Sequence, residues 1–322
     1  MSDLLPTLQS LIDDAQTHRP VALCTIVETR GSTPQCPGAT MLVRADGSTT
    51  GTLGGGCVEA EVRRRALELM HQGTSALLDY VLDHDFGWDD GLICGGRMKV
   101  AVMPFVGDCD LDPWRIALEN TRRREPASFP VDIDHDGKRL RYLVNLEIPP
   151  TLLIAGAGHV GQAVARLAVD LDFHVVVIDD RADYASSLRF DPRVKLIIGD
   201  IPRTLREQPL DAGSYVVIVT RGHQHDEQAV DAVVRRAAAY IGLIGSRRKS
   251  RLIFDDLRAL GVTDEQLARV HTPIGLDIRA ITVPEIAVSI VAELVKVRRE
   301  RIPALVEGPV EVPQAAASSA SR

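Results

Sequence analysis

Short apolar runs alternate with segments of helical periodicity from Thr151 onward. The runs are TLLIAGAG, HVVVID, VKLIIGD, SYVVIVT and YIGLIG. Strands that are apolar almost throughout belong to a parallel sheet that helices cover on both faces, because neither face meets water. Few other arrangements bury such strands, so this alternation constrains the fold more than any other feature. It predicts a doubly wound α/β domain over residues 151–300.

The first of these runs leads into LLIAGAGHVGQAVARLA, where Gly156, Gly158 and Gly161 have the spacing G-x-G-x-x-G. A strand precedes the glycines, a helix follows them, and the next strand ends in Asp179, as in a Rossmann-like dinucleotide site. There Gly158 lets a pyrophosphate approach the helix amides, and Asp179 accepts hydrogen bonds from ribose hydroxyls. NAD or another nucleotide is therefore a candidate ligand. Alternatively, the glycines only allow the helix to pack closely on the strand, since a fold does not fix a ligand.

The loop TRGHQHDEQ follows a later strand, at the edge where parallel sheets place their ligands. It offers His223, His225 and Asp226. Imidazole and carboxylate groups are metal ligands, so these residues are a weak candidate metal site. The competing interpretation is a helix start rich in polar capping side chains.

The loop IGSRRKSR follows the fifth apolar run. Ser246, Arg247 and Arg248 lie where a helix is expected to begin. Amides at a helix start and arginine side chains both bind phosphate, so the loop is a candidate phosphate clamp. A solvated basic turn is the alternative.

The N-terminal part of the chain predicts a second, smaller α/β domain over residues 1–106. Helical spacing runs from 3 to 18, a strand follows, and Asp46-Gly47 marks a hairpin turn. A further helix is expected from about Cys57 to His71. Residues 107–150 are polar and predict a connecting segment with one helix, and residues 301–322 bury little and predict a disordered tail.

Two glycine–cysteine loops stand out in this smaller domain. GTLGGGC brings Gly54, Gly55 and Gly56 directly before Cys57, and ICGGR contains Cys94. Glycine lets the backbone approach a ligand, and a thiol at a helix start is favoured as thiolate by the helix dipole. The two loops are therefore predicted to form one pocket with a reactive thiol. The alternative is a pair of small apolar residues at tight turns.

Charge and cysteine usage exclude several classes of protein. The net charge of −7 argues against a nucleic-acid partner, which needs a basic face. The apolar runs are shorter than the roughly 20 residues of a membrane helix, and the acidic start is unlike an export signal. The five cysteines form no C-x-x-C pair and fit reduced thiols in a cytoplasm. They lie at positions 24, 36, 57, 94 and 109.

Taken together, the motifs resemble the XdhC/CoxI family of accessory factors for molybdenum hydroxylases. The resemblance runs from about residue 10 to 298 through GSTPQCPGATMLV, GTLGGGCVEAEV, LICGG, LLIAGAGHVGQAVA, VVVIDDR, IGLIGSRRK and HTPIGLDI. It implies an XdhC/CoxI domain followed by a Rossmann domain. It also implies that the protein receives molybdenum cofactor (molybdopterin), supports its sulfuration with a cysteine desulfurase, and inserts it into a hydroxylase apo-enzyme.

The resemblance makes Cys57 the residue expected to contact the cofactor or carry its sulfur, because a thiolate suits a soft metal or a persulfide relay. It also implies a homodimer. The resulting hypothesis is a cofactor chaperone with at most a sulfur-transfer role. Two others stay open at this point: an NAD-dependent oxidoreductase that uses the Rossmann domain, and a nucleotide sensor that needs no thiol at position 57.

Overall fold

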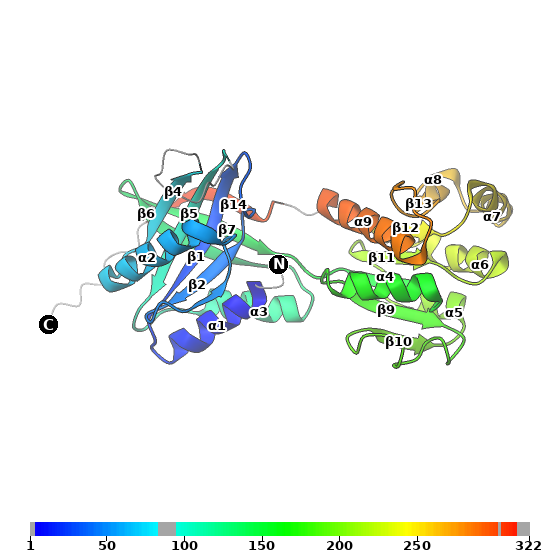
Figure 1. Cartoon of the computed structure of the whole chain (residues 1–322), viewed down its shortest axis with the longest axis horizontal. Coiled ribbons are helices and arrows are strands. Elements are labelled where there is room, and N and C mark those ends of the chain that lie inside the picture. Colours follow the sequence, from blue (N-terminus) through cyan, green and yellow to red (C-terminus); the bar gives the residue numbers. More distant parts are fainter. Residues whose placement is uncertain (1–3, 83–94, 302–303, 314–322) are drawn as a thin grey trace. The chain divides into compact units, whose positions relative to one another are not determined.

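The computed structural model describes residues 4–82, 95–301 and 304–313, and the chain divides into two compact units (Figure 1). The first unit comprises residues 1–148 and 303–322, and the second comprises residues 149–302. None of the helices within these described ranges is long and apolar enough to cross a membrane.

The first unit is built on a five-stranded antiparallel sheet in the order β3-β2-β1-β5-β4. Its strands are β1 (Val21–Arg30), β2 (Thr40–Arg44), β3 (Thr49–Gly51), β4 (Ala76–Val81) and β5 (Arg97–Phe105). The helices that the described part of this unit contains are α1 (Leu4–Gln16), α2 (Gly56–Gln72) and α3 (Asp112–Arg122).

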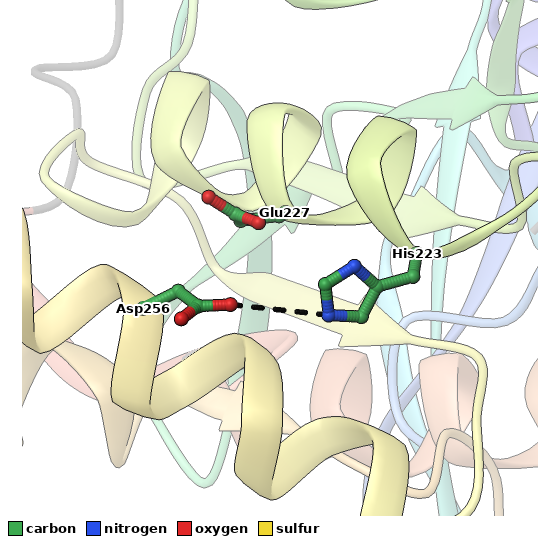
Figure 2. Close-up of side chains that lie close together, drawn as sticks. All are labelled: His223, Glu227 and Asp256. Atoms are coloured by element: carbon green, nitrogen blue, oxygen red, sulfur yellow. Dashed lines mark ion pairs between the residues drawn. The ribbon is translucent and has the colours of Figure 1, made fainter.

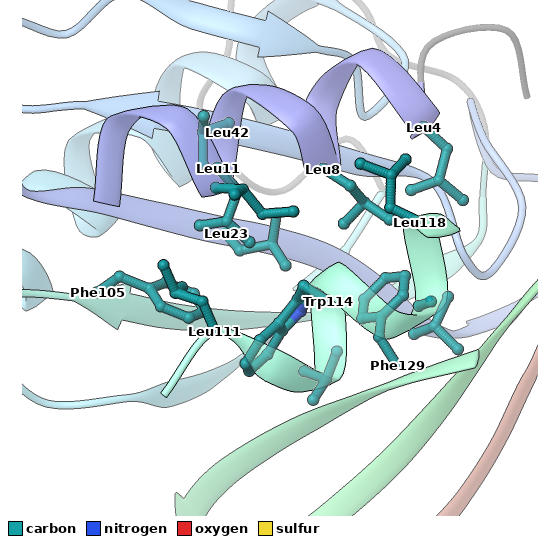
Figure 3. Close-up of a cluster of buried hydrophobic side chains, with 14 of the residues drawn as sticks. Leu4, Leu8, Leu11, Leu23, Leu42, Phe105, Leu111, Trp114, Leu118 and Phe129 are labelled. Atoms are coloured by element: carbon teal, nitrogen blue, oxygen red, sulfur yellow. The ribbon is translucent and has the colours of Figure 1, made fainter. Parts of the chain in front are cut away.

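Alternation along β1 gives this sheet two buried faces, because successive side chains point to opposite sides. Cys24 and Ile26 pack in the core that includes α2, whereas Leu23 packs in the core that includes α1 and α3. Figure 3 shows the second of these cores, in which Trp114 meets Phe105 edge to face with ring centroids 5.0 Å apart.

A second, three-stranded antiparallel sheet completes the first unit, in the order β14-β7-β6. Its strands are β6 (Ala127–His135), β7 (Lys138–Leu146) and β14 (Val306–Val312). Phe129, Val131 and Tyr142 are buried in the same core as α1, so residues 107–150 are not the mainly polar connection that the sequence predicts. The expectation of a disordered tail is wrong for residues 306–312, because β14 pairs with β7. Residues 314–322 lie outside the described residues.

The second unit confirms the doubly wound fold. Its six strands are all parallel and follow the order β10-β9-β8-β11-β12-β13. They are β8 (Thr151–Ala155), β9 (His174–Asp179), β10 (Lys195–Ile198), β11 (Ser214–Ile218), β12 (Tyr240–Leu243) and β13 (Val270–His271). The strand order changes direction beside β8, which is where such sheets bind ligands at the carboxyl ends of their strands.

Helices cover both faces of the parallel sheet. One face packs against α4 (His159–Val169) and α9 (Val283–Arg301), which lie side by side in Figure 1. The other face packs against α5 (Ile201–Glu207), α6 (His223–Val234), α7 (Arg247–Ala259) and α8 (Asp264–Leu267). In β8, Ile154 packs in the first of these cores and Leu153 in the second, as expected for a strand buried on both sides.

Candidate functional site

Three segments of the first unit meet at the ends of strands of its five-stranded sheet. They are the segment that follows β1, the glycine loop that follows β3, and the residues directly before β5. A methyl group at Gly54 would lie 2.4 Å from Pro34 Cβ, so the glycine loop lies directly against the segment that follows β1. Ser32, in the same segment, forms a parallel bridge with Gly95, which directly follows Cys94 in the chain. The structure therefore brings both predicted glycine–cysteine loops to the same segment. Cys94 itself lies outside the described residues.

The glycine loop is open at the point where it enters α2. Gly55 and Gly56 have φ angles of 78° and 71°, which side chains rarely adopt, and a methyl group on either would meet no atom within 4 Å. Cys57 follows in the first turn of the helix and is partly exposed. A flat ligand could therefore lie against bare backbone with a thiol beside it. By contrast, Cys24 is fully buried, and burial raises the pKa of its thiol.

Glu59 holds this loop in its conformation. Its Oε1 accepts hydrogen bonds from Leu53 N at 2.7 Å, from Gly55 N at 2.9 Å and from Thr52 Oγ1 at 2.5 Å. Burial opposes ionisation, but these hydrogen bonds outweigh it and lower the pKa of Glu59. The loop therefore carries a carboxylate, and the amides of Leu53 and Gly55 already have an acceptor.

In the second unit, packing accounts for two glycines of the fingerprint. A methyl group at Gly156 would lie 2.5 Å from Val219 O, and one at Gly161 would lie 2.0 Å from Gly156 O. These two glycines permit close approach of β8 to β11 and of α4 to the turn. A methyl group at Gly158 would meet nothing within 4 Å, so the protein's own packing does not require that glycine.

Asp179, the predicted ribose acceptor, is bound within the protein. It is 1% exposed. Its Oδ1 accepts from Arg181 Nε at 2.8 Å, and its Oδ2 accepts from Ala157 N at 2.7 Å. Burial alone would raise the pKa of Asp179, but Arg181 and the backbone amides lower it to about 2. A ribose could bind this carboxylate only if Arg181 moved away.

One residue of the predicted phosphate clamp already binds the helix that begins there. Ser246 is the N-cap of α7, and its hydroxyl accepts from Lys249 N at 3.3 Å. Arg247 and Arg248 are exposed in the first turn of α7. The two arginines remain available to an anion, whereas the serine hydroxyl is already engaged.

The structure does not present the predicted metal ligands as a group. Asp226 is fully buried, where it pairs with Lys249 and accepts from Thr220 Oγ1 at 2.5 Å. Within the described residues, the potential metal ligands that do gather are His223, Glu227 and Asp256, with one ligand atom of each within 4.8 Å of the others (Figure 2). His223 Nε2 lies 3.9 Å from Asp256 Oδ2, and an exposed polar contact of this kind between α6 and α7 needs no metal ion.

One partly buried polar cluster was missed in the sequence. Glu293, on α9, accepts from Gly275 N at 2.8 Å and from the hydroxyl of Tyr240, and it lies 3.0 Å from His271 Nδ1. Burial raises the pKa of Glu293, but His271 and Tyr240 reverse this effect and leave the pKa below its usual value. Glu293 thus ties α9 to β12 and to the turn after β13. Sequence spacing could not reveal this contact, because the partners lie 22 and 53 residues away.

The chain matches two sequence models of known protein families. The model of the XdhC Rossmann domain matches residues 152–294, and the model of the XdhC and CoxI family matches residues 15–81. The first region contains the parallel sheet from Leu152 onward, and the second contains the glycine loop and Cys57. Both matches fall on the regions that the sequence motifs single out.

Individual relatives agree with these matches. The chain is 31% identical over 280 residues to the uncharacterized protein YqeB of Escherichia coli, a match that covers 87% of this chain but only 44% of that relative. It is 28% identical to a probable xanthine dehydrogenase subunit of Bacillus subtilis, over 93% of this chain and 98% of that protein. It is also 25% identical to the molybdenum cofactor insertion chaperone PaoD of Escherichia coli, over 90% of this chain and 87% of that protein.

A solved structure shares the fold. It is that of a xanthine dehydrogenase from Bacillus halodurans, with a TM-score of 0.78, 23% sequence identity, and coverage of 94% of this chain and 97% of that chain. The glycine–cysteine loop, the Rossmann unit and these matches lead to one conclusion: the chain belongs to the XdhC and CoxI family.

Proposed function

We propose that this protein is an accessory factor that binds molybdenum cofactor and inserts it into the apo-form of a molybdenum hydroxylase of the xanthine dehydrogenase type. The observation that carries the proposal is the open loop Gly54–Gly56 with Cys57 at the start of α2. Support comes from the relatives named as a cofactor insertion chaperone and as a probable component of xanthine dehydrogenase.

The glycine loop is better suited to the pterin and the metal of molybdenum cofactor than to its phosphate. Molybdenum cofactor combines a flat pterin, a metal held by a dithiolene, and a phosphate. The bare faces of Gly55 and Gly56 leave room for a flat ring, and the sulfur of Cys57 is a suitable ligand for a soft metal. A phosphate is disfavoured at this point, because Glu59 is ionised and already occupies the amide of Gly55. The carboxylate of Glu59 can accept hydrogen bonds from N–H groups of the pterin, whereas it repels the phosphate anion.

Cys57 gives the proposal its chemical step. As a thiolate, it would attack the outer sulfur of a persulfide on a cysteine desulfurase. Cys57 would then carry that sulfur, and the desulfurase cysteine would leave as a thiolate. The sulfur would thus reach the protein that holds the cofactor before insertion, which joins sulfuration to delivery.

The Rossmann unit has a supporting role in this proposal. A nucleotide or the phosphate of the cofactor would approach the start of α4 over Gly158, where no side chain intervenes. An oxidoreductase that binds NAD through Asp179 is disfavoured, because Arg181 and Ala157 already occupy that carboxylate. We therefore do not propose hydride transfer as the activity.

A cofactor transfer assay tests the proposal. The protein is purified from cells that make molybdenum cofactor. The wild-type protein should carry molybdenum and activate a cofactor-free xanthine dehydrogenase. Cys57→Ala should melt like wild type but lose both properties. Cys109→Ala is the matched control, because Cys109 is also a partly exposed thiol, and its sulfur donates to Val106 O outside the glycine loop. Full activation by Cys57→Ala would show that Cys57 only packs, and a wild-type protein that never carries molybdenum would rule out the proposed function.

A further inference from the structure

The second unit has a cavity whose lining does not include Asp179. Its volume is about 530 Å³, which is within the usual range for binding pockets. One wall is a stripe of α4 in which His159, Ala163 and Arg166 follow helical spacing. The other walls are the segment that contains Phe190 and the start of α9 at Pro284. The cavity thus has an apolar floor and a polar wall.

Some charged side chains that line this cavity have partners within the protein, and one has no ion pair. Arg189 donates to Ala157 O at 3.0 Å and to Gln162 Oε1 at 3.1 Å, so its guanidinium is already hydrogen-bonded within the protein. Asp191 is paired with Arg193, which holds the pKa of Asp191 at about 2. Within the described ranges, Arg166 forms no ion pair. The cavity therefore presents an uncompensated positive charge.

Three exposed large apolar side chains lie within four residues, along the chain, of residues that line the cavity. Leu188, next to Arg189, is 96% exposed, and Ile281, two residues before Val283, is 87% exposed. Val288, one helical turn after Pro284, is 50% exposed. Single exposed apolar residues are ordinary, but several around one pocket mark a site for another protein. An exposed arginine beside apolar side chains is also typical of protein interfaces.

We propose that this face of α4 and α9 docks the apo-hydroxylase through a segment that carries a carboxylate next to a large apolar side chain. The apolar side chain enters the cavity over Phe190, and the carboxylate pairs with Arg166. This proposal rests on the proposed function. The glycine loop and Cys57 of the first unit take the pterin and the metal of the cofactor, and the face of α4 and α9 in the second unit recognises the client.

A second copy of this chain is a poorer occupant of the surface. In a symmetric dimer the same patch meets itself across the twofold axis, so one interface would contain two copies of the uncompensated Arg166 charge. Like charges across an interface oppose association. A partner with a carboxylate at this position has no such penalty.

Binding of the full-length protein to a cofactor-free xanthine dehydrogenase, measured by surface plasmon resonance, tests the surface. Arg166→Glu and Ile281→Asp should each weaken binding about tenfold or more. Added salt should weaken wild type more than Arg166→Glu, because only wild type keeps the charge pair. Matched controls on α7 are Arg251→Glu and Leu252→Asp, which also change exposed residues and should bind within about twofold of wild type.

The outcomes separate the docking surface from the function. If wild type binds and loads the apo-enzyme, but Arg166→Glu and Ile281→Asp bind equally well, the docking surface is wrong and the proposed function stands. If wild type neither binds nor loads the apo-enzyme, the proposed function fails, and the client assignment fails with it. If Ile281→Asp instead lowers the molar mass seen in light scattering, the surface joins copies of this chain and the proposal is overturned.

Discussion

Replacing Glu59 should test whether one carboxylate organises the glycine loop. Glu59→Ala removes the acceptor of two backbone amides and of the Thr52 hydroxyl at once. Hydrogen bonds to an ionised acceptor contribute about 1.5–3 kcal/mol each when buried, but water reaches this loop and replaces part of that. We expect a loss of about 2 kcal/mol in the free energy of unfolding, which is about a thirtyfold change in the folding equilibrium.

Urea unfolding followed by circular dichroism measures this loss, and hydrogen exchange locates it. The amides of Leu53 and Gly55 should exchange faster in Glu59→Ala. Glu59→Gln keeps an acceptor oxygen and should lose less stability, about 1 kcal/mol. Glu61→Ala is the matched control on the same helix, because it removes a surface pair with Arg64 and should cost under about 1 kcal/mol. Unchanged stability together with unchanged exchange in Glu59→Ala would refute this account of the loop.

The pH dependence of the same variants has a defined sign. The pKa of Glu59 is lower in the folded protein than its ordinary value of 4.5, so the folded state prefers the ionised form. The stabilisation is therefore complete above that value and is lost as the pH falls through the lower folded pKa. The stability difference between wild type and Glu59→Gln should shrink on acidification. A difference that stays constant with pH would show that the charge of Glu59 contributes nothing.

Three further predictions concern the second unit and the assembly. Gly158→Val should fold normally, because a Cβ at this position meets no atom within 4 Å, yet lose affinity for any nucleotide or cofactor phosphate; equal affinity in equilibrium dialysis would contradict it. Lys249→Met should lower the free energy of unfolding by about 3 kcal/mol, because it leaves the buried Asp226 unpaired, and a loss below about 1 kcal/mol would contradict that reason. Light scattering at micromolar concentration should give the mass of a homodimer, and a monomer would disprove the expectation.

The sequence was sufficient to predict the architecture of the second unit. Strands such as SYVVIVT are apolar on both faces, and they are accommodated by a sheet that helices cover on both faces. The second sheet of the first unit was not predictable in the same way. In β7, the buried Tyr142 and Val144 alternate with Arg141, Leu143 and Asn145, and β14 buries little of its surface. The edge strand β14 pairs with β7, which is distant in the chain, and local patterning does not identify that partner.

The candidate metal site shows how a small error in an element boundary changes a predicted site. His223 and His225 appear as a pair if the segment is extended or irregular. The helix α6 begins at His223, however, so residues two apart point to different sides and residues four apart share a face. Glu227 therefore joins His223, and Asp226 turns inward to Lys249. The residue types were correctly identified as polar and clustered, but the helix start decided which of them meet.

Asp179 shows that the position of a motif residue does not establish its availability. The acid is the last residue of the second strand of this unit, as the dinucleotide fingerprint requires, and the fold around it is the one predicted. The residue two places further on is an arginine, which reaches back and binds both carboxylate oxygens. A ribose would have to compete with a guanidinium that is covalently held nearby and therefore present at high effective concentration. Arg181 is what makes Asp179 a structural residue in this chain, so any nucleotide that binds over Gly158 must be held by contacts other than that carboxylate.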